Sequence, residues 1–143
     1  MPLLSIKGLM VAANGLHLID GVDLDVEGGK ICALVGESGS GKSLTALAAI
    51  GLLSDNLELI KGRIEFDNVN IAGFSEREMS SLRGRQISMI FQEPVGSLNP
   101  LAPVGDQVAE SLEVHGIASG KRAIFKAIEL MERVGIPQPE IRA

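Results

Sequence analysis

The most constraining feature of this sequence is a glycine-rich octapeptide, Gly36-Glu37-Ser38-Gly39-Ser40-Gly41-Lys42-Ser43. Its spacing fits the Walker A pattern G-x-x-x-x-G-K-[ST], in which successive backbone N–H groups point into one concavity that binds anionic oxygens. A helix that begins at the end of the octapeptide adds the positive pole of its dipole. Lys42 supplies a cation for β- and γ-phosphates, and Ser43 offers a hydroxyl oxygen to Mg²⁺. The octapeptide therefore predicts a phosphate-binding loop, called the phosphate loop below.

The residues on either side favour this prediction over a glycine-rich turn that fits the pattern by chance. Residues 30–35 form a short apolar run, which is typical of a buried strand. Residues 42 to about 53 are rich in Ala and Leu and predict a helix. Strand, loop and helix in this order form the setting that the pattern requires. Cys32 lies in the predicted strand and is expected to be a small core residue rather than a nucleophile.

The composition limits the classes of function that the chain can serve. The 143 residues are 45% hydrophobic with a net charge of −5, which is typical of a soluble globular domain. There is no basic stripe, and the aromatic residues are four Phe with no Trp or Tyr, so nucleic acid is not an expected partner. The single cysteine excludes an internal disulfide and suits a reducing cytoplasm. No long apolar span or signal-peptide pattern is present, so we expect no direct insertion into a membrane.

An antiparallel ribbon is expected ahead of the phosphate loop. Residues 3–13 and 16–26 predict two strands joined at Asn14-Gly15, because both of these residues tolerate the positive φ of a tight hairpin. In the second strand, apolar residues alternate with Asp23 and Asp25, which predicts a half-buried strand. Residues 57–71 predict a second strand pair. Small GTPases and nucleotide kinases usually place the phosphate loop close to the first strand, so the ribbon argues against them.

The remaining segments predict short helices, one more strand and a loop. Ser75 and Glu78 fit a capping box at the start of a helix that ends at Gly84. Residues 86–91 predict an apolar strand that ends at Gln92, and residues 93–103 predict a loop from their Pro, Gly, Ser and Asn content. Two helices follow, with apolar faces that we interpret as packing surfaces: Val104, Val108 and Leu112 on the first, and Ile124, Ala127, Ile128 and Met131 on the second.

A second motif lies around Gln92. The stretch Ser88-Met89-Ile90-Phe91-Gln92-Glu93-Pro94, followed by Ser97-Leu98-Asn99-Pro100, resembles the Q-loop of ABC transporter ATPases. Together with residues 36–45, it is similar to the oligopeptide, dipeptide and nickel importer branch. The resemblance implies an α/β P-loop NTPase core of the ABC ATPase type, with an N-terminal antiparallel β subdomain and the start of a helical subdomain. It divides the chain into a nucleotide-binding core, residues 1–92, and a Q-loop extension with a truncated helical subdomain, residues 93–143.

The resemblance also implies ligands and residue roles. The ligands are ATP and Mg²⁺, with Lys42 and Gln92 as catalytic residues and with Ser43 and Gln92 on the metal. A neutral amide at Gln92 suits this role because it reports the γ-phosphate without adding charge. The alternative for Gln92 is an ordinary polar residue at a strand end. The residues implied to bind the nucleotide are Gly36, Glu37, Ser38, Gly39, Ser40, Gly41, Lys42, Ser43, Leu44 and Thr45.

The sequence departs from the family in two respects. The position at which the family has an aromatic residue that stacks on adenine corresponds to about Ala13 here. There is no Phe, Tyr or Trp nearby, and His17 is the only ring in the region, so weak binding of adenine is expected. The sequence also contains no Leu-Ser-Gly-Gly signature, no apolar strand ending in Asp-Glu (Walker B) and no switch histidine. We therefore expect an N-terminal part of an ATPase that does not turn over ATP by itself.

The sequence raises three candidate functions. The first is the ATP-binding subunit of an ABC importer, which in the intact protein hydrolyses ATP to drive uptake of peptides or similar small solutes. It would lie peripherally on the cytoplasmic face of the cell membrane, pair with a second ATPase subunit and contact permease subunits through the loop after Gln92. The second is a nucleotide-binding module without turnover, or a non-transport ABC-type ATPase. The third, a kinase or GTPase, is disfavoured because the sequence has no Asn-Lys-x-Asp motif to read guanine.

Overall fold

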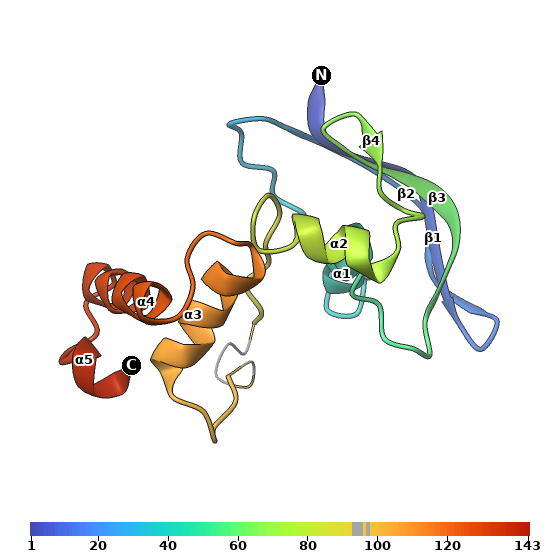
Figure 1. Cartoon of the computed structure of the whole chain (residues 1–143). Helices are drawn as coiled ribbons and strands as arrows, with labels where there is room; N and C mark the ends of the chain where they lie inside the picture. Colours follow the sequence, from blue (N-terminus) through green and yellow to red (C-terminus); the bar gives the residue numbers. More distant parts are fainter. Residues whose placement is uncertain (93–95, 97) are drawn as a thin grey trace. The chain divides into compact units, whose positions relative to one another are not determined.

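Strand β1 (Pro2–Ala13) is the centre of an antiparallel sheet. It pairs with β2 (Leu16–Glu27) on one side and with β3 (Glu58–Phe66) on the other, and β4 (Val69–Asn70) completes the order β2-β1-β3-β4 (Figure 1). The turns Asn14–Gly15 and Asp67–Asn68 have positive φ at both residues, 49° and 80° in the first and 48° and 65° in the second. Positive φ at both positions matches the twist of the flanking strands. The predicted ribbon and the second strand pair are confirmed.

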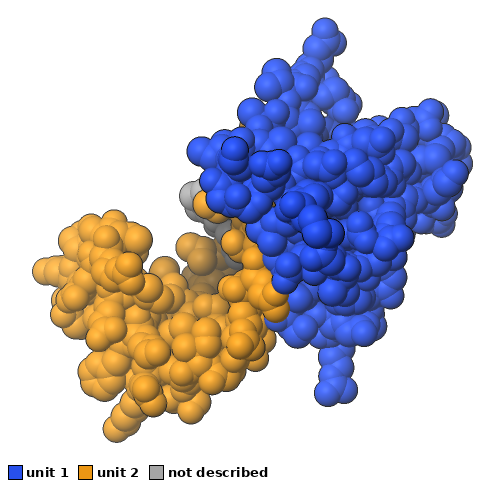
Figure 2. Space-filling view, turned by 90° about the horizontal axis from the view of Figure 1, so that it is seen from above, with its two compact units in different colours: residues 1–83 blue, residues 84–143 orange. Residues whose placement is uncertain are grey.

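The computed structural model describes residues 1–92, 96 and 98–143. These residues form two compact units, Met1–Arg83 and Gly84–Ala143, which are coloured separately in Figure 2. The first unit holds the sheet, the phosphate loop and two helices, α1 (Lys42–Ala49) and α2 (Glu76–Leu82). The second unit is helical.

The core of the first unit lies between the sheet and its two helices (Figure 1). Ala48 and Ala49 of α1 and Met79 of α2 pack into one cluster with buried side chains of the sheet: Ile6, Leu9, Val11, Ile19 and Ile64. Strands β1 and β3 approach closely at Gly62, where an added Cβ would lie 2.8 Å from the Leu9 Cα. Only glycine fits there, because its φ of +126° is also a conformation that other residues rarely adopt.

The pairing of β1 with β2 contains a bulge next to the phosphate loop. Val11 pairs with Ile19 and Ala12 pairs with His17, so Leu18 has no opposite residue in the ladder. A bulge of this kind leaves one residue unpaired and redirects its side chain. Since β2 is an edge strand, Leu18 lies at the border of the sheet, and 42% of its surface is exposed.

Two predicted strands are wrong. Residues 30–35 and 86–91 lie outside the sheet, and the described residues provide neither segment with a neighbouring strand. Apolar side chains in both are exposed, with Ile31 at 100% and Ile90 at 91%. Cys32 is exposed as well, which corrects its expected place in the core. The physical reason is that an extended segment becomes a strand only when another segment satisfies its backbone N–H and C=O groups.

The helical predictions are mostly confirmed. Ser75 and Glu78 form the expected capping box at α2, whereas α1 ends at Ala49, a few residues earlier than predicted. The second unit contains α3 (Val104–Val114), α4 (Lys121–Arg133) and a short α5 (Pro139–Arg142) that was not predicted. Its core consists of small and branched residues from the predicted packing faces and their surroundings: Ala109, Ala118, Ala123 and Ala127, with Val108, Leu112 and Ile124 against them.

Within the loop predicted at residues 93–103, Glu93, Pro94, Val95 and Ser97 lie outside the described residues. In the part of the chain that the structure describes, no helix has the length and apolar character needed to cross a membrane.

Candidate functional site

The phosphate loop leads directly into the first turn of α1. All residues from 31 to 40 are exposed, and Gly41 takes the N-cap position with φ +88°. Glycine has no side chain that could satisfy the first N–H groups of the helix, so these donors face the loop. The backbone of the loop is tightened by a turn in which Ser40 N donates to Glu37 O at 3.2 Å.

Two glycines of the loop have close neighbours that leave little room for a side chain. At Gly36, an added Cβ would lie 2.7 Å from the Ser40 hydroxyl oxygen, inside the loop itself. At Gly41, it would lie 3.3 Å from Cγ1 of Ile19 and 3.6 Å from the carbonyl oxygen of Leu18. The C-terminal end of the loop therefore lies directly against β2 at the bulge.

The Lys42 side chain folds back across the loop. Its ammonium donates to the carbonyl oxygens of Gly36 at 2.8 Å and Glu37 at 2.6 Å, and it lies 3.3 Å from the Ser40 hydroxyl. A cation is thus held in the concavity by neutral acceptors only. A phosphate oxygen is a stronger, charged acceptor for the same ammonium, so an anion can replace the carbonyl partners.

The residues after Lys42 differ in their surroundings. Ser43 is exposed, and Leu44 is half-buried. Thr45 is only 3% exposed, and its hydroxyl donates to the carbonyl oxygen of Gly41 at 2.9 Å. Thr45 therefore fastens the first turn of α1 to the end of the loop, and its predicted contact with nucleotide stays a prediction.

A surface hollow of about 300 Å³ lies beside the loop. It is lined by Leu18, Gly39, Gly41, Lys42, Ser43 and Leu44. Lys42 is the one charged residue in this lining, and the two large apolar side chains are leucines rather than aromatic residues. His17, the one ring close in sequence to the position where the family stacks adenine, is exposed and does not belong to the lining. Sequence reasoning missed Leu18, because only the bulged register of β2 brings it to the loop.

Gln92 belongs to the second unit and is exposed there. Across residues 1–92, 96 and 98–143, no three His, Cys, Asp or Glu side chains gather where they could hold a metal ion. The Ser43 hydroxyl is a hard oxygen ligand of the kind that Mg²⁺ accepts, and Mg²⁺ usually takes few protein ligands together with substrate phosphates. The residues at the loop therefore fit Mg²⁺ as a companion of a phosphate ligand.

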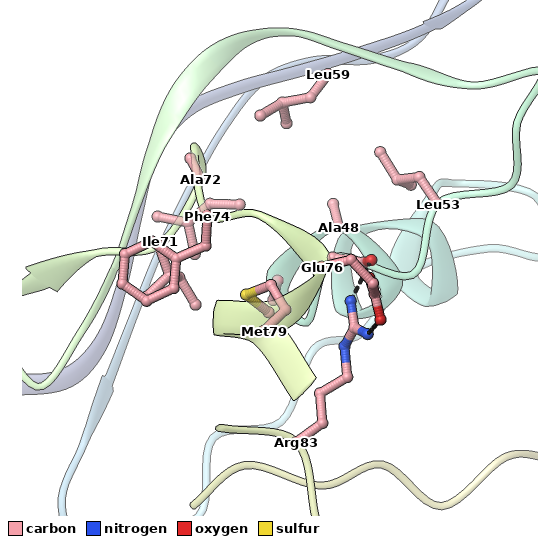
Figure 3. A pocket seen from close by; sticks show the side chains of 12 residues that line it. Ala48, Leu53, Leu59, Ile71, Ala72, Phe74, Glu76, Met79 and Arg83 are labelled. Atoms are coloured by element: carbon pink, nitrogen blue, oxygen red, sulfur yellow. Dashed lines mark hydrogen bonds and ion pairs between the residues drawn. The ribbon is translucent and has the colours of Figure 1, made fainter. Parts of the chain in front are cut away.

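A second cavity, of about 150 Å³, lies between the sheet, α1 and α2. Figure 3 shows Leu59, Ile71 and Met79 around it and Arg83 beside Glu76. The Arg83 guanidinium donates to the carbonyl oxygens of Ile50 at 2.8 Å and Gly51 at 2.7 Å, just beyond the C-terminal end of α1. It also donates to the Glu76 carboxylate at 2.6 Å, and this bond lowers the pKa of Glu76. Arg83 thus fixes the end of α1 opposite to the phosphate loop.

The other shifted groups of the first unit lie outside the phosphate loop. The Lys7 ammonium, followed by the Ser5 hydroxyl, lowers the pKa of Asp25 through hydrogen bonds, and Asp25 in turn raises the pKa of Lys7. Hydrogen bonds from Ser75 lower the pKa of Glu78 in the capping box. The hydrogen bonds that cause these shifts stabilise the sheet and the start of α2 locally.

Comparison with known proteins places these features in a family. A family model described as "ABC transporter" matches residues 19–142. The chain is 39% identical over 147 residues to an oligopeptide transport ATP-binding protein of Mycobacterium tuberculosis, a match that covers 99% of this chain and 24% of that protein. It is 42% identical over 130 residues to a dipeptide transport ATP-binding protein of Lactococcus lactis, covering 90% of this chain and 37% of that protein. The chain thus spans well under half of the length of these relatives.

A solved structure has the same fold. It is a dimeric ATP-binding cassette in a post-hydrolysis state with ADP and Pi, and it matches with a TM-score of 0.75 and 23% identity over 90% of this chain and 56% of that one. The fold class expected from the sequence, an ABC-type α/β unit with an N-terminal antiparallel part, is confirmed by this match. At this level of identity, the likeness concerns the fold alone.

Proposed function

The chain belongs to the ABC transporter family, and we propose that it is the nucleotide-binding part of an importer ATPase that uses MgATP to drive uptake of peptides or similar small solutes. The observation that carries the proposal is the Lys42 ammonium, held inside a glycine loop at the N-terminus of α1 beside an open hollow. The peptide-transport names of relatives with about 40% identity support the solute class.

Phosphate binding follows from an exchange of partners at Lys42. The β- and γ-phosphate oxygens replace the carbonyl oxygens of Gly36 and Glu37 as acceptors of the Lys42 ammonium. The backbone N–H groups of residues 39–43 donate to the same phosphate oxygens. Glu37 and Ser38 are exposed residues of the loop, and Leu44 and Thr45 follow in the first turn of α1. Phosphoryl transfer to water depends on positioning and charge neutralisation more than on covalent chemistry, which suits a site of this composition.

Ser43 and Gln92 are the residues that would hold Mg²⁺, and the ion supplies neutralisation of phosphate charge when bound. The neutral amide of Gln92 adds no charge of its own and can accept from water or offer its oxygen to a cation. Ser43 lies on the hollow, so it is available to an ion that arrives with the nucleotide.

The intact importer would contain further chains. We propose membrane permease subunits that contact the loop after Gln92, and a second ATPase subunit of the same kind. Attachment to the permease would keep the protein peripheral, on the cytoplasmic face of the membrane.

A second candidate, nucleotide binding without turnover, applies to the 143 residues alone. The observation in its favour is that the sequence has no Asp-Glu pair after an apolar strand to supply a general base. We expect the purified 143-residue protein to release phosphate from MgATP no faster than the Lys42→Ala variant does. A Lys42-dependent rate would contradict this expectation.

Isothermal titration calorimetry tests the binding proposal. MgATP is titrated into the parent protein, into Lys42→Ala, and into Lys61→Ala, which removes an equal charge from an exposed position on β3. We expect Lys42→Ala to weaken binding at least tenfold, since a charge-assisted bond to phosphate is lost, and Lys61→Ala to bind like the parent. Equal affinity of all three proteins, or no heat from any of them, would overturn the proposal.

A further inference from the structure

We propose that Gln107 is a positioning residue, which holds the turn formed by residues 99–102 in one fixed shape and so presents Leu101 as an apolar contact for a membrane permease subunit. This inference rests on the proposed function, in which the loop after Gln92 contacts the permease. The hydrogen bonds of the Gln107 side chain and the exposure of Leu101 carry it together.

The turn from Asn99 to Ala102 has a local cause. Asn is favoured at the first position of a β-turn and Pro at the second, because the fixed φ of Pro100 matches the turn. The backbone N–H of Ala102 donates to the carbonyl oxygen of Asn99 at 3.2 Å, and the N–H of Leu101 donates to the side-chain oxygen of Asn99 at 3.0 Å. Leu101 occupies the third position with 93% of its surface exposed. The turn therefore presents a large apolar side chain to solvent.

The Gln107 side chain fastens this turn to the first turn of α3. Its Oε1 accepts from the backbone N–H of Asn99 at 2.8 Å. Its Nε2 donates to the carbonyl oxygens of Asn99 and Ala102, both at 3.0 Å. One half-buried residue of α3 thus binds the first and the last residue of the turn, so the turn and the start of α3 have one shape.

These three bonds require an acceptor and donors at the end of one side chain. The N–H of Asn99 can only donate, and the two carbonyl oxygens can only accept. A carboxylate at position 107 would lack the donors, and an ammonium would lack the acceptor, whereas an amide has one acceptor oxygen and two N–H donors. Glutamine therefore fits this position, and methionine, of similar length, offers neither N–H donors nor a strong acceptor.

The surroundings of Leu101 suit an uncharged, apolar partner surface. Residues 94–105 contain no charged residue, in a chain in which 22% of the residues are charged. Leu98, just before the turn, is also exposed, at 45%. A side chain that is held in place before binding loses less conformational entropy when it binds. Because the proposed permease contact lies after Gln92, we assign Leu101 to that contact.

Exchange of backbone amides with water, measured by NMR on the 143-residue protein, tests the hydrogen bonds of Gln107. The variants are Gln107→Met and the control Glu110→Ala, which changes an exposed position on the same helix. Gln107→Met should speed exchange of the Asn99 amide roughly five- to tenfold, since this exposed N–H loses its acceptor. Glu110→Ala should match the parent. Exchange of the Ala109 amide, buried in α3, should stay unchanged in both variants and thereby show that the helix remains formed.

The intact importer, reconstituted with its permease subunits in phospholipid vesicles, tests the role of the turn. The quantity measured is the amount of peptide taken up per ATP hydrolysed. We expect Gln107→Met and Leu101→Ser to lower it roughly fivefold, the lower end of typical coupling between sites, and Glu110→Ala to leave it unchanged. Leu101→Ser should leave exchange of the Asn99 amide as in the parent, because the bonds of Gln107 go to other residues.

Two results overturn the inference while leaving the proposed function intact. One is an unchanged exchange rate of the Asn99 amide in Gln107→Met. The other is an unchanged uptake per ATP in Gln107→Met or in Leu101→Ser. A parent importer that hydrolyses ATP but takes up no peptide would instead overturn the proposed function, and this inference with it.

Discussion

Arg83 is expected to hold the phosphate-loop helix in place from its far end, and Arg83→Met tests this directly. The substitution keeps much of the apolar stem but removes the donors to the carbonyls of Ile50 and Gly51 and to Glu76. Ile50 is buried at 6% exposure, so its carbonyl loses a partner where water has little access, whereas Gly51 is exposed.

The magnitude follows from these surroundings. Leaving one buried carbonyl unsatisfied costs about 1–3 kcal/mol, and the exposed Gly51 carbonyl adds little because water can replace the guanidinium. The pair with Glu76 adds little, because the Glu76 side chain is 74% exposed and water screens the interaction. We therefore expect Arg83→Met to lower the free energy of unfolding by about 1–3 kcal/mol, most of it from the buried carbonyl of Ile50.

Urea unfolding followed by far-UV circular dichroism measures this effect, because the chain has no Trp or Tyr to report by fluorescence. Glu76→Gln is the matched control, since it keeps the bonds from Arg83 to the end of α1 and removes the charge pair, and it should cost clearly less than Arg83→Met because the pair is exposed. A loss below about 0.5 kcal/mol for Arg83→Met, or an equal loss for both variants, would refute the reasoning that the backbone carbonyls dominate.

Two further predictions concern the sheet and the second helix. Gly62→Ala should destabilise the protein by about 2 kcal/mol or more, because its Cβ would meet the Leu9 backbone at 2.8 Å and φ is +126°. Thermal unfolding checks this against Gly73→Ala, since Gly73 is exposed and an added Cβ there would have no atom within 4 Å. Equal melting temperatures of the two variants would contradict the prediction. Folding lowers the pKa of Glu78 from 4.5, so its contribution to stability is present above that pH and is lost as pH falls through the folded pKa. Glu78→Gln should therefore reduce the loss of stability between neutral pH and acid, and unchanged pH dependence in urea titrations would argue against a role for the capping box.

Local rules predicted the elements whose causes are local. Asn14-Gly15 needs only two residues that accept positive φ, and the capping box of α2 needs only Ser75 and Glu78 at the right spacing. The strands predicted at residues 30–35 and 86–91 are wrong because an apolar run indicates only a preference for burial, and it does not supply the neighbouring strand that would pair with it and cover it. Leu18 was missed for a related reason, since a bulge is a property of the pairing between two strands. At the candidate site, the phosphate loop could be found from its motif, but the Leu18 side chain that lines the hollow beside it could not.

The exposure of Cys32 has a practical consequence. It is the single thiol of the chain, it lies on the surface, and it precedes Gly36 by a few residues on the segment that leads into the phosphate loop. A maleimide fluorophore would therefore attach at one defined position without any cysteine having to be removed or introduced. The chain thus provides its own attachment point for a spectroscopic reporter of ligand exchange at the loop.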